Sequence, residues 1–118
     1  MEEILTIVEN ILPQLHGWCS FEKAKKIIEL IDKNKPELCV EIGVFGGSSL
    51  IPQALALSSN KKGKIFGIDP WSTESALEEM VGADHKKWWG ELNLESIYLG
   101  CVQKIEQLGI QKYCEDRK

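Results

Sequence analysis

Apolar residues near the start of the chain repeat at intervals of three and four, the spacing of one face of an amphipathic helix. This repeat runs through residues 2–16 and predicts a helix that Pro13 ends or kinks. After a break at residues 17–19, Ser20 stands where a helix N-cap is expected, and a second apolar repeat follows. Residues 34–36 end this second helix, because proline pushes its predecessor out of the helical region.

Beyond the second helix the pattern changes to short, nearly continuous apolar runs. Residues 38–42 predict a buried parallel strand, and residues 64–69 predict another that ends in a carboxylate. Between them, a helix begins at Leu50, with Pro52 in its first turn, where the missing N–H is harmless. A strand, a crossover helix and a parallel strand together form one right-handed βαβ unit.

The last third of the chain is less regular. Residues 72–81 indicate a short helix, residues 82–90 a loop, and residues 91–108 a longer amphipathic helix for which Gly109 is a natural end. Residues 111–118 are too polar to be predicted as a buried third strand. The predicted sheet therefore has two strands.

These elements predict an α/β fold, a Rossmann-like doubly wound parallel sheet that is incomplete and consists of N-terminal helices plus a first βαβα unit. We divide the chain into an N-terminal helical segment, residues 1–36, and a partial Rossmann-like domain, residues 37–118. The polar ending after Gly109 favours truncation. Because parallel strands need cover on both faces, we expect a homo-oligomer or a completing chain that uses the open sheet edge.

Composition narrows the class of protein. The 118 residues, 43% hydrophobic and 27% charged, are typical of one folded domain, and the net charge of −4 argues against a nucleic-acid partner. No apolar run approaches the roughly 20 residues that cross a membrane, and no secretion signal opens the chain. The four cysteines form no C-x-x-C pair, so we predict a cytoplasmic protein with reduced thiols and no metal site.

The candidate site lies at the carboxyl ends of the two predicted strands, where open parallel sheets bind ligands. There, Gly43 and Gly47 allow positive φ and a close approach of a ligand to the backbone. Asp69 could accept hydrogen bonds from the hydroxyl groups of a ribose, or could be a turn residue before a proline. Phe45 stands where a G-x-G-x-x-G fingerprint has its middle glycine, which favours a ligand without a pyrophosphate.

Two motifs carry a resemblance to a known family. Residues 40–49, which read V-E-I-G-V-F-G-G-S-S, and residues 66–71, which read F-G-I-D-P-W, resemble class I S-adenosylmethionine-dependent methyltransferases of the small-molecule type. The resemblance implies that Glu41 and the glycines line the methionine part of S-adenosylmethionine and that Asp69 binds its ribose. The expected cofactor-binding residues are Glu41, Gly43, Phe45, Gly47, Ser48, Asp69 and Trp71.

The resemblance implies methyl transfer to a small-molecule acceptor, but it assigns no catalytic residue within this chain. One alternative is a truncated, non-catalytic module that binds a nucleoside or another protein. A nicotinamide-dependent oxidoreductase fragment is a further alternative, which Phe45 disfavours. Trp71, Trp88 and Trp89 either cover a cofactor or pack in an interface, and His85 is either a base or an exposed loop residue.

Overall fold

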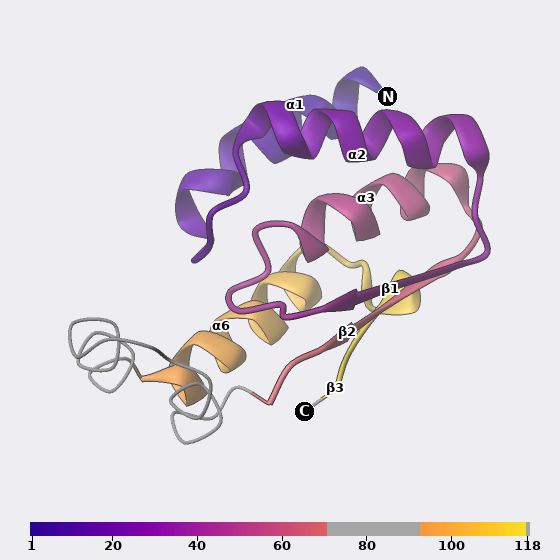
Figure 1. Ribbon diagram of the computed structural model, residues 1–118. Coiled ribbons are helices and arrows are strands. Elements are labelled where there is room, and N and C mark those ends of the chain that lie inside the picture. Colours follow the sequence, from indigo (N-terminus) through magenta and orange to yellow (C-terminus); the bar gives the residue numbers. More distant parts are fainter. Residues whose placement is uncertain (71–92, 118) are drawn as a thin grey trace.

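The computed structural model describes residues 1–70 and 93–117, which form a small three-stranded parallel sheet and four α-helices (Figure 1). Helix α1 (Glu2–Ile11) continues into the 3-10 turn η1 (Leu12–Gln14), and helix α2 (Phe21–Asn34) follows. The predicted change at Pro13 is confirmed, since the α-helix ends and the 3-10 turn contains this proline. No helix in the described part of the chain is long and apolar enough to cross a membrane.

Helix α2 begins and ends where its sequence indicates. The Ser20 hydroxyl accepts a hydrogen bond from the backbone N–H of Lys23 at 3.2 Å, as expected for an N-cap. At the other end Lys35 adopts a left-handed conformation with φ of 48° and its N–H donates to the carbonyl of Ile31.

The sheet is formed by β1 (Leu38–Ile42), β2 (Lys64–Ile68) and β3 (Cys114–Arg117), in the order β1-β2-β3. Helix α3 (Leu50–Asn60) connects β1 to β2, which confirms the predicted βαβ unit. Helix α6 (Leu94–Gln107) and the turn η2 (Gln111–Tyr113) precede β3. The short helix predicted for residues 72–81 and the loop predicted for residues 82–90 lie outside the described residues.

The third strand corrects the prediction for the C-terminal residues. Cys114 pairs with Ile65 and Arg117 pairs with Ile68, and all strands are parallel. The apolar pattern did not predict this strand because Asp116, an acid, occupies one of its two inward positions. Glu115 points outward and forms ion pairs with Lys64 and Arg117. A four-residue strand with only one apolar inward residue has no recognisable period of two.

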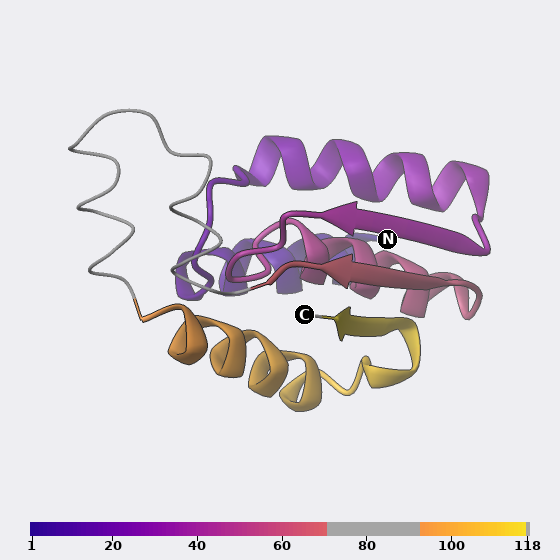
Figure 2. The ribbon, with the colours of Figure 1, turned by 60° about the horizontal axis from the view of Figure 1, so that its bottom comes forward.

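The helices in the described part of the chain lie over one face of the sheet (Figure 2). That face carries Ile65 and Cys114, both buried, and it packs on α3 and α6 to form the core. Burial of aliphatic side chains of this size stabilises a fold by about 1.5–3 kcal/mol each. In the part of the chain that the structure describes, the largest fully buried side chains are Val8, Ile28, Leu50, Ile51, Pro52, Leu57, Ile65 and Cys101.

The opposite face of β1 is open, which corrects the prediction that this strand is buried. The side chains of Leu38, Val40 and Ile42 are 62%, 55% and 83% exposed. The prediction failed because a continuous apolar run indicates burial on both faces, whereas in the described residues only one face is covered. The double winding expected from the sequence is not seen in this part of the chain.

Candidate functional site

A glycine loop, residues 43–49, connects β1 to α3 at the carboxyl ends of the strands (Figure 1). As predicted, Gly43 and Gly47 have positive φ, 84° and 88°. The two glycines differ in their surroundings. A Cβ at Gly47 would lie 2.8 Å from the sulfur of Cys101, whereas a Cβ at Gly43 would meet nothing within 4 Å among the described residues. Gly47 is therefore needed for packing, and Gly43 leaves its backbone open to a ligand.

Asp69 fastens the glycine loop to the end of β2. Its Oδ2 accepts hydrogen bonds from the backbone N–H groups of Val44 and Phe45, at 2.8 and 2.9 Å. The N–H of Gly43 donates to the carbonyl of Ile68 at 2.9 Å and extends the sheet ladder into the loop. Charge-assisted hydrogen bonds of this kind contribute about 1.5–3 kcal/mol each, so the carboxylate stabilises the loop conformation.

The segment that precedes α2, residues 15–20, packs tightly on the glycine loop. The ring of Trp18 stacks on Phe45 with a centroid distance of 5.1 Å, and His16 meets the same ring edge-on at 6.4 Å. The backbone N–H of Cys19 donates to the hydroxyl of Ser48 at 3.3 Å. These contacts hold Phe45, which has a left-handed φ of 56°, in a conformation that bulky residues rarely adopt.

Two further carboxyl groups, those of Glu41 and Asp116, lie near the ends of β1 and β3, on either side of the strand that Asp69 follows. Glu41 of β1 and Asp116 of β3 both pair with Gly67 of β2, and they point to the same face of the sheet. Gly67 has no side chain, and the side chains of Val44 and Leu50 pack over it, at 2.8 and 3.0 Å from the position that a Cβ would take. Oε2 of Glu41 and both oxygens of Asp116 are buried without a hydrogen-bond partner in the described structure.

The surroundings of these acids favour their protonated forms. Burial raises the pKa of Glu41, the charge of Asp116 raises it further, and a hydrogen bond from Ser49 opposes the shift. Burial likewise raises the pKa of Asp116, the neighbouring Cys101 thiol opposes the shift, and the charge of Asp69 raises the pKa further. The site therefore places two acids where burial and repulsion from neighbouring carboxylates disfavour their charged forms.

The thiols near the site are not activated nucleophiles. Burial raises the pKa of Cys114 to about 12, and it raises the pKa of Cys101 well above its usual value. A thiol attacks efficiently only as a thiolate, which neither residue forms near neutral pH. Within the described ranges, no three or more His, Cys, Asp or Glu residues are arranged to hold a metal ion.

The structure brings together six of the seven residues expected to bind the cofactor, and Trp71 lies outside the described residues, as do His85, Trp88 and Trp89. Of these six residues, Gly43 has free space around its Cβ position among the described residues. Ser48 is buried, and its hydroxyl accepts a hydrogen bond from the backbone N–H of Cys19. Sequence reasoning missed Asp116 and Trp18. The spacing of Cys114 and Asp116 was a weak signal for an inward acid, and no pattern in the sequence links Trp18 to Phe45.

A scan against protein-family models and a search of curated proteins both find no match to this chain. The features of this chain that bear on its function are the glycine loop, Asp69, the neighbouring acids and the two motifs at residues 40–49 and 66–71.

Proposed function

We propose that the chain binds S-adenosylmethionine over the glycine loop and forms the cofactor-binding part of a methyltransferase. The observation that carries the proposal is the open backbone at Gly43, between the carboxyl ends of two parallel strands, in a loop fastened by Asp69. Ligands of open α/β sheets bind in this position. In this proposal the sheet is part of a doubly wound Rossmann-like fold in a cytoplasmic protein.

The hydrogen bonds of Asp69 favour a nucleoside over a dinucleotide. Loops that hold a pyrophosphate direct their backbone N–H groups at its oxygens. Here the N–H groups of Val44 and Phe45 donate to a carboxylate of the protein itself. A phosphate would have to displace that carboxylate and would meet its negative charge. This supports a cofactor without a pyrophosphate over a nicotinamide dinucleotide.

Bound S-adenosylmethionine would supply an electrophilic methyl group to a nucleophile of a small-molecule acceptor. The residues of this chain would position the cofactor: the glycine loop by close backbone approach, and Asp69 by holding the loop in shape. Among the described residues we assign no general base that would deprotonate the nucleophile of the acceptor. The proposal therefore concerns cofactor binding, and the methyl acceptor is a small molecule of unassigned structure.

Gly43→Ala is expected to weaken binding of S-adenosylhomocysteine by about tenfold or more, because the added methyl group projects into the space over the loop. Isothermal titration calorimetry measures the affinity. Gly109→Ala is the matched control, since Gly109 also has a positive φ, 68°, and open space around its Cβ position. Both variants carry similar backbone strain, about 1 kcal/mol.

Equal affinity of the two variants for S-adenosylhomocysteine would contradict a cofactor site over Gly43. Absence of binding by the unaltered, folded chain would contradict the proposed function itself. NAD, titrated in the same way, separates a nucleoside site from a dinucleotide site.

A second candidate function, an interaction module, is favoured by the open face of β1. Leu38, Val40 and Ile42 form an apolar stripe there, which we call the β1 stripe. Beside it, Lys64 and Arg117 both lie over the ring of Phe66 on β2, at 5.2 and 4.7 Å from its centroid, whereas Ile68, which pairs with Ile42, is 42% exposed and continues the apolar surface. Exposed contiguous apolar surface of this kind marks sites of protein association. A second copy or a completing chain would cover it.

Val40→Lys is expected to reduce concentration-dependent association, because a charged side chain at the middle of the β1 stripe would have to be desolvated on contact. Sedimentation velocity over a range of protein concentrations measures the effect. Leu30→Lys is the control, because Leu30 is a similarly exposed apolar residue, 58% exposed, on α2. Association that is equal in both variants would exclude the β1 stripe as the contact surface.

A further inference from the structure

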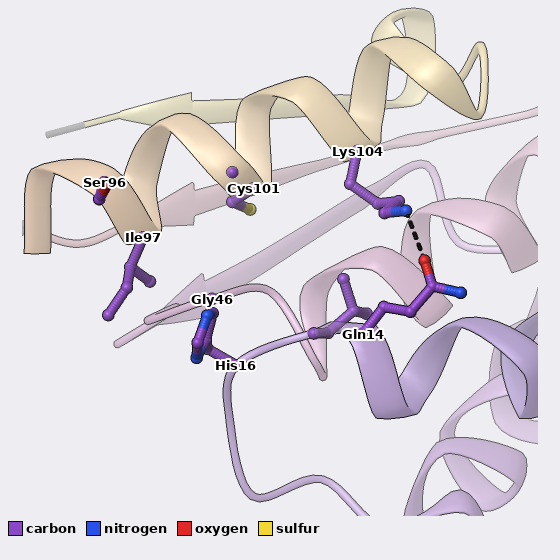
Figure 3. A pocket seen from close by; sticks show the side chains of 9 residues that line it. Gln14, His16, Gly46, Ser96, Ile97, Cys101 and Lys104 are labelled. Carbon is purple, nitrogen blue, oxygen red and sulfur yellow. Dashed lines mark hydrogen bonds between the residues drawn. The ribbon is translucent and has the colours of Figure 1, made fainter.

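A cavity of about 220 Å³ lies between the glycine loop, the segment after α1 and one face of α6 (Figure 3). Ile97, Cys101 and Lys104 line it from α6 at helical spacing, and residues 14–16 line the opposite wall. Gly46 is the one member of the glycine loop among the lining residues, and Gly43 is not part of the cavity. The cavity is therefore distinct from the proposed cofactor position, and its volume is below the roughly 300 Å³ at which pockets for drug-sized ligands begin.

The lining of this cavity contains a positive charge and no acid. Among the described residues that line the cavity, Lys104 is the charged one and none is Asp or Glu. The ammonium group of Lys104 donates to Oε1 of Gln14 at 2.9 Å, a neutral partner, and it has no carboxylate partner in the part of the chain that the structure describes (Figure 3). Such an arrangement favours an anionic ligand.

Gly100 provides space on the α6 wall. It lies inside the helix, where glycine is less favourable than alanine by about 1 kcal/mol. A Cβ at this position would meet nothing within 4 Å among the described residues, so no packing contact there requires a glycine. Leu15, Ile97 and Cys101 add apolar surface to the lining. The space beside Gly100 thus borders both apolar side chains and one ammonium group.

We propose that this cavity binds a small organic carboxylate with a short aliphatic body. The carboxylate contacts Lys104, and the aliphatic part lies beside Gly100 between Leu15 and Ile97. The imidazole of His16 and the hydroxyl of Ser96 also border the cavity and can donate hydrogen bonds to the anion. The inference does not depend on the proposed cofactor, because it involves neither Gly43 nor Asp69.

The test is a titration of the full ¹⁵N-labelled chain with isovalerate, followed by NMR chemical shifts of the backbone amides. We expect saturable shifts at Gly46 and Gly100 with a Kd on the order of 1 mM, as befits so small a ligand. Isovaleramide has the same aliphatic body without the charge, and inorganic phosphate has the charge without the body. Neither should produce these shifts at the same concentration and ionic strength.

Two variants locate the site. Lys104→Gln should weaken isovalerate binding by about tenfold or more, through loss of the charge-assisted hydrogen bond. Gly100→Leu should abolish binding by filling the cavity, and it should still fold, because leucine is the better helix former. Gln103→Leu, at an exposed position of α6 that does not line the cavity, should bind as the unaltered chain does.

The proposal is overturned by equal binding of isovaleramide or phosphate, by unchanged affinity in Lys104→Gln or Gly100→Leu, or by absence of shifts at about 20 mM isovalerate.

Discussion

Gly46→Ala is expected to destabilise the fold by on the order of 3 kcal/mol, which lowers the melting temperature by about 10 °C. A Cβ at Gly46 would lie 2.4 Å from both the Cβ and the carbonyl oxygen of His16. Backbone atoms cannot move aside as a flexible side chain can, so the glycine loop and residues 15–20 would have to separate. Urea unfolding followed by tryptophan fluorescence measures the change.

The separation should also be visible in the aromatic contacts of Phe45. Trp18 stacks on this ring, so the fluorescence of the folded Gly46→Ala variant should differ from that of the unaltered chain. Gly100→Ala is the control, because the same substitution at a helical position without neighbours within 4 Å should stabilise the protein slightly. Equal stability of the Gly46→Ala variant and the unaltered chain would contradict the tight packing of the two loops.

Asp116→Asn is expected to stabilise the protein at pH 7 by on the order of 1 kcal/mol and to reduce the dependence of its stability on pH. Both carboxyl oxygens of Asp116 are buried without a partner, and its pKa is raised by burial and by the charge of Asp69. The amide has nearly the same shape and no charge to desolvate. Thermal unfolding between pH 4 and pH 8 measures the effect.

The sign of the pH dependence follows from the direction of the pKa shifts. In the unfolded chain, Glu41 and Asp116 lose their protons near pH 4, whereas in the folded chain their raised pKa values retain protons to higher pH. Between the two pKa values the native state binds more protons, so stability falls as pH rises. The benefit of Asp116→Asn should therefore be largest above the folded pKa and vanish near pH 4.

Glu29→Gln is the control for this experiment, because Glu29 is exposed on α2 and the substitution removes the same charge. Glu41→Gln should act in the same direction as Asp116→Asn. The double variant should gain less than the sum of the single variants, since each substitution relieves the repulsion felt by the other acid. A pH profile that is identical in Asp116→Asn and the unaltered chain would exclude a strained carboxyl pair.

Much of the fold could be predicted because local signals and tertiary packing agree. Ser20 caps α2 as its position before an apolar repeat indicates, and residues 38–42 and 64–68 are strands joined by a helix. The apolar pattern could not predict which face of the sheet the helices cover, because the cover depends on how the helices pack against the sheet. Leu38, Val40 and Ile42 illustrate the difference, since they are apolar and yet exposed.

The part of the candidate site that could be predicted is the glycine loop, because a backbone conformation with positive φ favours glycine. Gly43 and Gly47 have the positive φ values that a turn after a parallel strand uses. Contacts between distant segments left no such signal. Residue types do not show that Asp69 would accept hydrogen bonds from the loop. Nor do they show that Glu41 and Asp116 would lie on either side of Gly67.

The parallel pairing of all three strands also has a consequence for how the chain folds. Leu38 meets Lys64, and Ile65 meets Cys114, so each contact in the sheet joins residues that are far apart in sequence. Loop-closure entropy must be overcome before such contacts form, and chains rich in them fold slowly. The β1-α3-β2 unit closes the shorter loop and should form first. Until β3 docks, β2 then has a free edge, and the folding intermediate is the state most exposed to aggregation.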